Sequence, residues 1–551
     1  MEESSSIDNE SAIRNSHSAM TGSFFVALGI FASRVAGLIR QRVFSHYFGL
    51  RNDAADAFTA AFRIPNFLQN LFGEGALSAS FIPVYASLLA RGEREEADRV
   101  AGAVAAALAL IVSVLVLIGV IATPLLIGAI APGFHGSKRE LTIAVVRVLF
   151  PGAGLFVMSA WCLGVLNSHR RFLLSYASSV VWNLAMIVTL LVFGPGTPLP
   201  RLAVILAWGS VAGALLQFVV QLPVVFSVAP GVWSGLMRGG ALSPADVTLK
   251  GSRHMAHVRT IGRNFLPVFV SRGVVQLSAY VDSLIASLLG TGAVTGLQNA
   301  STLYTLPVSL FGMSVSAAEL PAMSGEIGVD PQATAALRAR LDHGLRQIAF
   351  FIVPSAIAFL AFGDVIAGAL FQTGRFTEAD AVTVWGILAG SAVGLLASTL
   401  GRLYSSTYYA LHDTRTPLNY AIVRVALTVV LGFLFAFPLR RALGLAEIWG
   451  AAGLTASAGV AGWVEMLLLR STLNRRIGPS GLPASYVAKL WTAAVAGAVA
   501  GWAAKAVAGV SQPIVNAVIV LGPYGIVFFA VTFALRIPEA ASLLARLKPR
   551  A

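Results

Sequence analysis

Arginine residues inside long apolar segments are the residues of this sequence with the clearest potential for chemistry. Arg34 and Arg40 both lie in the first such segment, among Val, Ala, Leu and Ile residues. A charged side chain at the centre of a bilayer costs roughly 3 kcal/mol on insertion scales, so residues of this kind usually serve a function. Because the planar guanidinium group suits two-point pairing with phosphate, the arginines predict a site for a phosphate-bearing anion.

Other apolar segments also contain ionisable residues, and arginines outnumber carboxylates among those well inside the segments. At about 100° per residue, Arg34 and Arg40 point about 120° apart on one helix, so they could border one broad cavity. The alternative is that single residues reach the membrane interface or form buried salt bridges. The further ionisable residues are Asp56, Arg63, Glu74, Arg147, Arg272, Asp282, Glu319, Arg402 and Arg424.

Asp282 lies near the end of its apolar segment, where its carboxylate could bind a coupling cation together with backbone carbonyl groups. It could equally pair with a nearby arginine, and both interpretations stay open.

The composition requires a membrane as the solvent for most of the chain. Of its 551 residues, 56% are hydrophobic and 12% are charged, with a mean hydropathy of +0.77, whereas soluble domains contain about 25% charged residues. The apolar segments are continuous and do not alternate with polar residues, so they predict helices and exclude a barrel. The expected fold is an all-α integral membrane protein of about 14 transmembrane helices.

The positive charge follows from membrane topology. The formal net charge is +14, but the Lys and Arg residues are scattered among the loops and concentrate on one side of the predicted membrane. This pattern predicts cytoplasmic N- and C-termini and argues against a nucleic-acid partner. The first twenty residues are polar and acidic, so no cleavable signal peptide is expected.

An internal duplication organises the chain into two halves. Phe31-Ala-Ser-Arg34 recurs as Phe269-Val-Ser-Arg272, a shift of 272 − 34 = 238 residues. Similar shifts relate Phe72-Gly73 to Phe311-Gly312, Pro83 to Pro321 and His169 to His412. Six helices per copy is an even number, so the repeats run parallel, with a site expected between them near the midplane.

The predicted domains follow from this duplication, with two C-terminal helices outside it. They are a polar cytoplasmic segment (1–20), an N-terminal lobe of six helices (21–230), a basic cytoplasmic linker (231–258), a C-terminal lobe of six helices (259–475) and a two-helix extension with a basic end (476–551).

The sequence lacks the usual motifs of enzymes. It contains no Walker A, HExxH or GxSxG motif and no spacing of Cys and His residues for a metal. The single cysteine, Cys162, lies in an apolar segment and is interpreted as a packing residue. The chain is therefore expected not to be an enzyme and to need no cofactor.

Several motif blocks closely resemble the MurJ (MviN) family of lipid II flippases, and the resemblance covers essentially the whole chain. The blocks are Ser33-Arg34-Val-Ala-Gly37-Leu-Ile-Arg40, Phe62-Arg63-Ile64-Pro65-Asn66, Phe72-Gly-Glu74-Gly75-Ala76, Phe371-Gln-Thr-Gly374-Arg-Phe376-Thr377 and His412-Asp413-Thr-Arg-Thr416-Pro417.

The resemblance implies the multidrug/oligosaccharidyl-lipid/polysaccharide exporter fold, with two six-helix lobes around a central cavity. It implies that the last two helices form a groove for a polyprenyl tail. The cargo would be lipid II, an undecaprenyl-diphosphate-linked cell-wall precursor, which alternating access moves outward across the cytoplasmic (inner) membrane. Membrane lipids and the cell-wall synthesis machinery are the implied partners. The implied cavity residues are Arg34, Arg40, Asp56, Arg63, Arg272 and Arg402.

Departures from the family pattern keep alternative functions open. Gln69 and Thr302 stand where the family usually has cavity cations. The alternatives are a paralogue that flips another polyprenyl-diphosphate-linked glycan, a drug or cation antiporter, and a non-transporting envelope scaffold. Asp282 fits a sodium-site carboxylate of some family members, so coupling to Na⁺ or to the membrane potential is a further expectation.

Overall fold

Helices connected by short turns make up the described part of the protein. The computed structural model describes residue 29 and residues 31–232, 256–265, 280–324 and 331–547. These residues contain no strand, so the predicted all-α fold is confirmed. Nine helices among them are long and apolar enough to cross a membrane, or ten if one bent pair forms a single span. The predicted number of about 14 transmembrane helices stays a prediction.

The chain divides into two compact units. Unit 1 comprises residues 1–47 and 53–280, and unit 2 comprises residues 48–52 and 281–551. This division falls later than residue 259, where the duplication places the start of the second lobe. Residues before the boundary contact unit 1: Ile261 belongs to its core cluster, and the Tyr280 hydroxyl donates a hydrogen bond of 2.7 Å to the backbone oxygen of Arg63.

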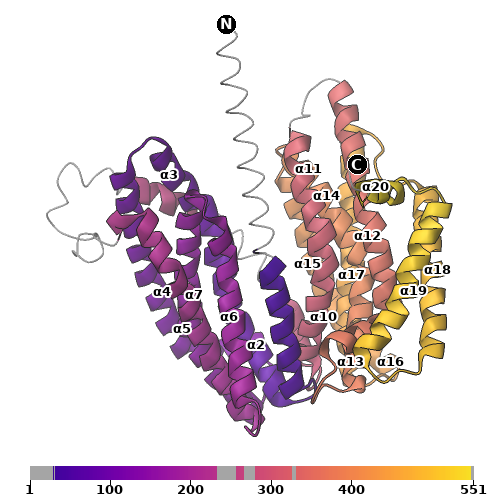
Figure 1. Cartoon of the computed structure of the whole chain (residues 1–551), viewed down its shortest axis with the longest axis horizontal. Coiled ribbons are helices and arrows are strands. Elements are labelled where there is room, and N and C mark those ends of the chain that lie inside the picture. The colour runs from indigo at the N-terminus through magenta and orange to yellow at the C-terminus, as the bar shows by residue number, and fades with distance from the viewer. Residues whose placement is uncertain (1–28, 30, 233–255, 266–279, 325–330, 548–551) are drawn as a thin grey trace, which may run out of the picture. The chain divides into compact units, whose positions relative to one another are not determined.

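Unit 1 is a bundle in which α5 takes the central place. Figure 1 shows α4, α5, α7 and α6 as long helices that run side by side, and α5 packs against α2, α4 and α7. The described helices are residues 31–48, α2 (Asp53–Gln69), η1 (Asn70–Leu77), α3 (Ser78–Ala90), α4 (Arg94–Ile130), α5 (Gly136–Ser168), α6 (Phe172–Phe193), α7 (Leu199–Val228) and residues 256–265.

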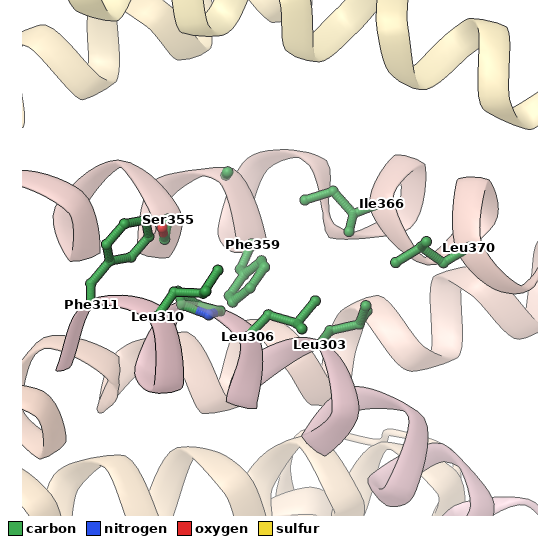
Figure 2. A pocket seen from close by; sticks show the side chains of 10 residues that line it. Leu303, Leu306, Leu310, Phe311, Ser355, Phe359, Ile366 and Leu370 are labelled. Atoms are coloured by element: carbon green, nitrogen blue, oxygen red, sulfur yellow. The ribbon is translucent and has the colours of Figure 1, made fainter. Parts of the chain in front are cut away.

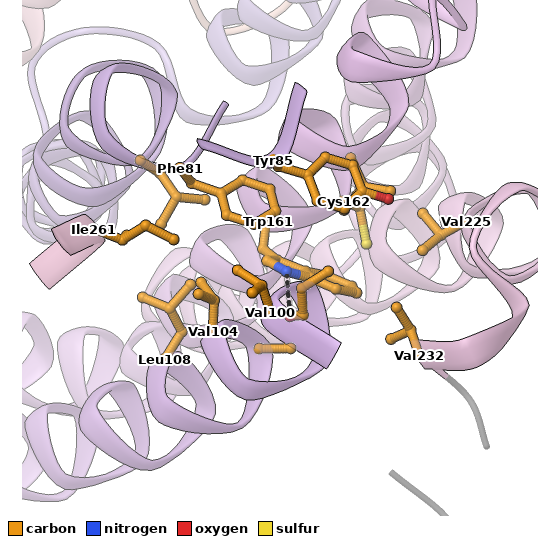
Figure 3. Close-up of a cluster of buried hydrophobic side chains, with 14 of the residues drawn as sticks. Phe81, Tyr85, Val100, Val104, Leu108, Trp161, Cys162, Val225, Val232 and Ile261 are labelled. Atoms are coloured by element: carbon orange, nitrogen blue, oxygen red, sulfur yellow. Dashed lines mark hydrogen bonds between the residues drawn. The ribbon is translucent and has the colours of Figure 1, made fainter. Parts of the chain in front are cut away.

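Aliphatic side chains, with several aromatic ones among them, form a buried cluster in unit 1 that includes residues of α3, α4 and α5 (Figure 3). Trp161 is 2% exposed, and its indole nitrogen donates a hydrogen bond of 3.1 Å to the backbone oxygen of Ala101. This bond satisfies the polar atom of a side chain that is otherwise apolar. Cys162 lies in the same cluster as a free, fully buried thiol, as the sequence predicts.

Unit 2 contains one helix of 41 residues, α12, and several short or irregular elements. Its elements are a helix of residues 280–287 that begins at the boundary, α10 (Ala293–Pro307), η3 (Val308–Met313), α11 (Ser314–Ser324), α12 (Pro331–Phe371), α13 (Glu378–Val393), α14 (Leu395–Ala410), α15 (Arg415–Leu434), η4 (Phe435–Leu439), α16 (Arg440–Ala442), η5 (Glu447–Trp449), α17 (Gly450–Ile477), α18 (Ala484–Ala508), α19 (Pro513–Ala534) and α20 (Pro538–Leu547).

The two C-terminal helices α18 and α19 form an antiparallel pair that packs on α12 (Figure 1, yellow). Tyr524 of α19 donates a hydrogen bond of 2.6 Å to the backbone oxygen of Pro354 in α12. Lys505 of α18 forms an ion pair of 2.6 Å with Asp364 of α12. The sequence does not predict the short helix α20 that follows them.

Backbone irregularities recur at the spacing of the duplication. The π-helix η1 begins at residue 70 and the π-helix η3 at residue 308, a shift of 308 − 70 = 238. Arg170 and His412, 242 residues apart, are both non-glycine residues with φ of 59°. Since π-helical turns and left-handed residues are rare, their recurrence supports two copies of one fold.

The segment Phe48–Asn52 connects the helix of residues 31–48 to α2 and belongs to unit 2. Phe48 and Leu50 are 1% and 0% exposed. Gly49 has φ of +66°, and a Cβ atom there would lie 2.8 Å from the backbone oxygen of Arg375. Arg51 donates a hydrogen bond of 2.9 Å to Thr383 and lies 3.6 Å from the Asp380 carboxylate.

The motif from His412 to Pro417 shapes the turn between α14 and α15. The Asp413 carboxylate accepts hydrogen bonds of 3.0 Å from the backbone nitrogens of Arg415 and Thr416. It also pairs with Arg476 at 2.7 Å. The hydrogen bonds from the Thr416 backbone and hydroxyl, together with Arg476, lower the pKa of Asp413 to about 2.

We expect Asp413→Asn to destabilise the protein at neutral pH by about 1 kcal/mol, as for the loss of a helix cap. A lowered pKa means that the stabilisation is present above the ordinary carboxyl value near 3.8 and is lost as the pH falls towards 2. Thermal unfolding in detergent measured from pH 7 to pH 3 tests this expectation. A difference between wild type and variant that stays constant below pH 4 would contradict it.

Candidate functional site

Arg40 is the predicted site residue with the most distinctive surroundings. Its guanidinium carbon lies 5.1 Å from the ring centroid of Phe62 and 5.0 Å from that of Trp182. The two rings stack on each other at 5.5 Å. Nη1 also lies 3.7 Å from the sulfur of Met186. Among the described residues no carboxylate forms an ion pair with Arg40, and its Nε atom is buried without a hydrogen-bond acceptor.

This environment keeps Arg40 in place without neutralising its charge. Aromatic faces attract a cation by about 0.5–2 kcal/mol, but they supply no negative charge. The residues that hold Arg40 come from α2 and α6, and Trp182 is itself fixed by a hydrogen bond of 3.2 Å from its indole nitrogen to Ser210 of α7. A positioned arginine that lacks a counterion is suited to bind an anion.

The remaining predicted arginines have different environments. Arg34, on the same helix as Arg40, is exposed and forms no ion pair with a described residue. Arg63 is half-buried on α2. Arg272 and the side chains of Gln69 and Glu74 lie outside the part that the structure describes. Thr302 is half-buried, and its hydroxyl donates to the backbone oxygen of Gln298 at 2.9 Å.

Asp56 is engaged within unit 1. Its side chain is fully buried, and it accepts a hydrogen bond of 2.8 Å from Lys138 at the start of α5. Lys138 also lies 3.3 Å from Asp53 and 4.4 Å from the ring centroid of Phe134. The structure therefore shows Asp56 in a buried ion pair, while its predicted role in substrate binding stays a prediction.

Arg402 is a predicted cavity residue of unit 2 and lies on α14. Its side chain is exposed, although α14 belongs to a bent pair that is apolar enough to span a membrane. It makes no hydrogen bond or ion pair with another described residue. By contrast, Arg424 of α15 pairs with Glu465 of α17 at 3.0 Å. This arginine therefore forms a salt bridge between helices, which is the alternative given above.

Asp282 is half-buried on the helix of residues 280–287. One turn further, the side chain of Ile285 meets Gly432 of α15, beside Ser457 of α17. The predicted role of Asp282 in binding a coupling cation stays a prediction. The described residues contain no cluster of three His, Cys, Asp or Glu side chains that could hold a metal ion.

An apolar cavity of about 250 Å³ lies between α10–η3 and α12 (Figure 2). Its lining residues flank Pro307, where α10 changes to the π-helix η3, and Phe362, where the backbone of α12 is non-helical. Its lining suits a hydrocarbon chain, and its only polar side chain, Ser355, donates to a backbone oxygen of its own helix. The lining residues are Leu303, Leu306, Pro307, Leu310, Phe311, Ser355, Ala358, Phe359, Ile366 and Leu370.

Sequence reasoning missed the residues that hold Arg40. Phe62 belongs to a motif block, but Trp182 and Met186 are more than 140 residues away in sequence and carry no motif. A tryptophan in the middle of an apolar segment, away from the interface where tryptophan usually lies, was the available signal.

Comparison with known proteins identifies the family. The model of the family described as lipid II flippase MurJ matches residues 44–520. The lipid II flippase MurJ of Burkholderia cenocepacia is 32% identical over 447 residues, which is 81% of each chain. A probable lipid II flippase MurJ from Vibrio cholerae is 29% identical over 453 residues, or 80% of each chain.

Solved structures show the same fold at lower identity. A lipid II flippase MurJ in an inward closed conformation aligns with a TM-score of 0.72 and 22% identity, covering 93% of this chain and 100% of that one. An inward-facing multidrug resistance MATE transporter of the MOP superfamily aligns with a TM-score of 0.62 and 17% identity, covering 80% and 95%. The fold predicted from the motifs is thus confirmed, and the chain belongs to the lipid II flippase MurJ family.

Proposed function

We propose that this protein flips lipid II, the polyprenyl-diphosphate-linked cell-wall precursor, from the inner to the outer leaflet of the cytoplasmic membrane. The observation that carries this proposal is Arg40, a positioned cation with no carboxylate partner among the described residues of a membrane-embedded bundle. Membership of the family, shown by the match over residues 44–520, supports lipid II as the cargo. Both termini would lie in the cytoplasm, as the distribution of basic residues predicts.

The proposed mechanism is alternating access without covalent chemistry. Arg40 and Arg34 would bind the diphosphate of the headgroup, while the polyprenyl tail stays in contact with apolar surfaces of unit 2. Those surfaces are the predicted groove at α18 and α19 and the cavity beside α12. The cargo drives the cycle only if it binds the inward and outward states with different affinity, since equal binding shifts no equilibrium.

Energy for the cycle would come from a sodium gradient or from the membrane potential. Asp282 is the residue proposed to bind Na⁺, because it is the half-buried carboxylate of its helix and lies one turn from Ile285, which packs beside Ser457 of unit 2. A direct partnership with the cell-wall synthesis machinery is part of the proposal and rests on the proposed cargo.

Reconstitution in liposomes tests the function directly. Purified protein is mixed with fluorescent lipid II, and the headgroup that appears on the outer face is measured by an impermeant quencher. We expect transfer that depends on the protein and responds to an imposed sodium gradient or membrane potential. Transfer of an organic cation drug but not of lipid II would instead support the antiporter alternative, and transfer of neither would favour a scaffold.

A further inference from the structure

The helix α14 exposes one polar strip and buries everything else. Ser398 and Ser405 are half-buried and Arg402 and Tyr409 are exposed, whereas every other residue of α14 is buried. The four positions are separated by four, three and four residues, so they lie within about 60° of one another on the helix. The strip from Ser398 to Tyr409 is about 16 Å long at 1.5 Å per residue.

A strip of this composition does not face hydrocarbon. Other helices of unit 2 expose large apolar side chains, such as Ile422, Val430 and Phe433 of α15. The remaining faces of α14 are covered by α11, α12, α17 and η3. Within a membrane span, the exposed face of α14 carries only hydroxyl groups, a phenol and a guanidinium group. It must therefore face water or a polar ligand.

The hydrogen-bonding capacity of the strip is largely unused within the described residues. Ser398 accepts from Tyr304 of α10 at 2.7 Å while its own hydroxyl donates to the backbone oxygen of Leu395. Arg402, Ser405 and the Tyr409 hydroxyl make no side-chain hydrogen bond or ion pair with another described residue. The side chains of Arg402, Ser405 and Tyr409 follow one another along the strip. They are therefore available to form hydrogen bonds with a ligand over two turns of helix.

We propose that the strip of α14 binds the glycan part of the lipid-linked cargo. The proposal rests on the proposed flippase function and assigns the uncharged glycan to unit 2. Sugars offer many hydroxyl groups, which act as both donors and acceptors, and C–H faces, which pack on aromatic rings. Ser405 and Arg402 supply hydrogen bonds of the matching kind, and Tyr409 supplies a ring that is 48% exposed.

A phosphate group is a poorer match for this strip. Among its four residues only Arg402 carries a charge, whereas sites for a diphosphate gather several cations or backbone N–H groups. An organic cation would be repelled by Arg402. The composition thus favours a neutral, hydroxyl-rich ligand that is oriented by one charged donor.

Binding of two cargoes that share the polyprenyl diphosphate, only one of which carries the glycan with its peptide, tests the proposal. The probes are lipid II and undecaprenyl diphosphate, and affinity is measured by native mass spectrometry of the full-length protein in detergent. Loss of about two ligand hydrogen bonds and a ring contact in Ser405→Ala/Tyr409→Leu should weaken lipid II binding about tenfold or more. Binding of undecaprenyl diphosphate should change less than twofold. Arg402→Gln should show the same pattern.

The control is Ser471→Ala on α17, an exposed serine whose hydroxyl contacts only a backbone oxygen of its own helix; both affinities should match wild type. Equal weakening of both cargoes by the strip variants, or no weakening of lipid II, would overturn the proposal. Wild-type protein that binds neither probe would instead refute the proposed flippase function. Tyr409→Phe retains the ring and should fall between wild type and Ser405→Ala/Tyr409→Leu, which separates stacking from a folding defect.

Discussion

Arg40→Met is expected to reduce lipid II transport by about a hundredfold while the protein still folds. Methionine keeps an unbranched side chain against Phe62 and Trp182 but removes the charged donors that would bind the diphosphate. Charge-assisted hydrogen bonds contribute about 1.5–3 kcal/mol, so losing a two-point contact corresponds to about two orders of magnitude. The measurement is headgroup exposure in liposomes, normalised to the amount of monodisperse protein.

Arg91→Met serves as the matched control, because Arg91 is exposed at the end of α3 and its side chain contacts only Ser87. The control should transport at the wild-type rate. Wild-type transport by Arg40→Met would remove the observation on which the proposed diphosphate site depends. Arg40→Lys should recover only part of the activity, since lysine retains the charge but not the planar fork.

Lys138→Met is expected to have the largest effect on stability. It removes the ammonium group that lies 2.8 Å from the fully buried Asp56 carboxylate. Removing one member of a buried ion pair costs about 3–5 kcal/mol, because the remaining charge loses its compensation. A strong drop in the yield of folded protein and in its unfolding temperature is therefore expected, measured by fluorescence-detected chromatography after heating.

The double variant Asp56→Asn/Lys138→Met should recover much of that stability, because no buried charge is left unpaired. Its transport activity then separates two roles of Asp56. If the stable double variant transports lipid II at the wild-type rate, the role of Asp56 is limited to its ion pair with Lys138. Loss of transport with recovered stability would instead support the predicted role of Asp56 in substrate binding.

The helical fold and its duplication could be predicted from the sequence because both follow from local patterns. Continuous apolar segments predict membrane helices, and the described residues are helical without a strand. The pairing of Arg40 with Trp182 was beyond prediction because it depends on how helices distant in sequence pack. The same holds for the ion pair between Lys138 and the buried Asp56 carboxylate, because these residues are 82 apart in sequence.

The bend between α13 and α14 is a second feature that could not be predicted from the sequence. Residues 379–411 form one apolar segment, yet the helix bends by 42° at Gly394. A Cβ atom at Gly394 would lie 2.3 Å from the Cα atom of Gly459 in α17, so the two backbones touch there. Many other glycines of this sequence lie inside helices, so the residue type alone does not predict a bend. The backbone contact of Gly394 with Gly459 depends on how the two helices pack.

The five residues from Phe48 to Asn52 limit how the gene could be divided. A cut in the linker at residues 231–258 would separate the two sequence repeats, but the fragment with the second repeat would lack Leu50 and Arg51, which are part of its own fold. Neither fragment would then be a self-sufficient module. Split versions of this flippase should therefore assemble only when both pieces are made together, and the second repeat produced alone should need this short peptide added in trans.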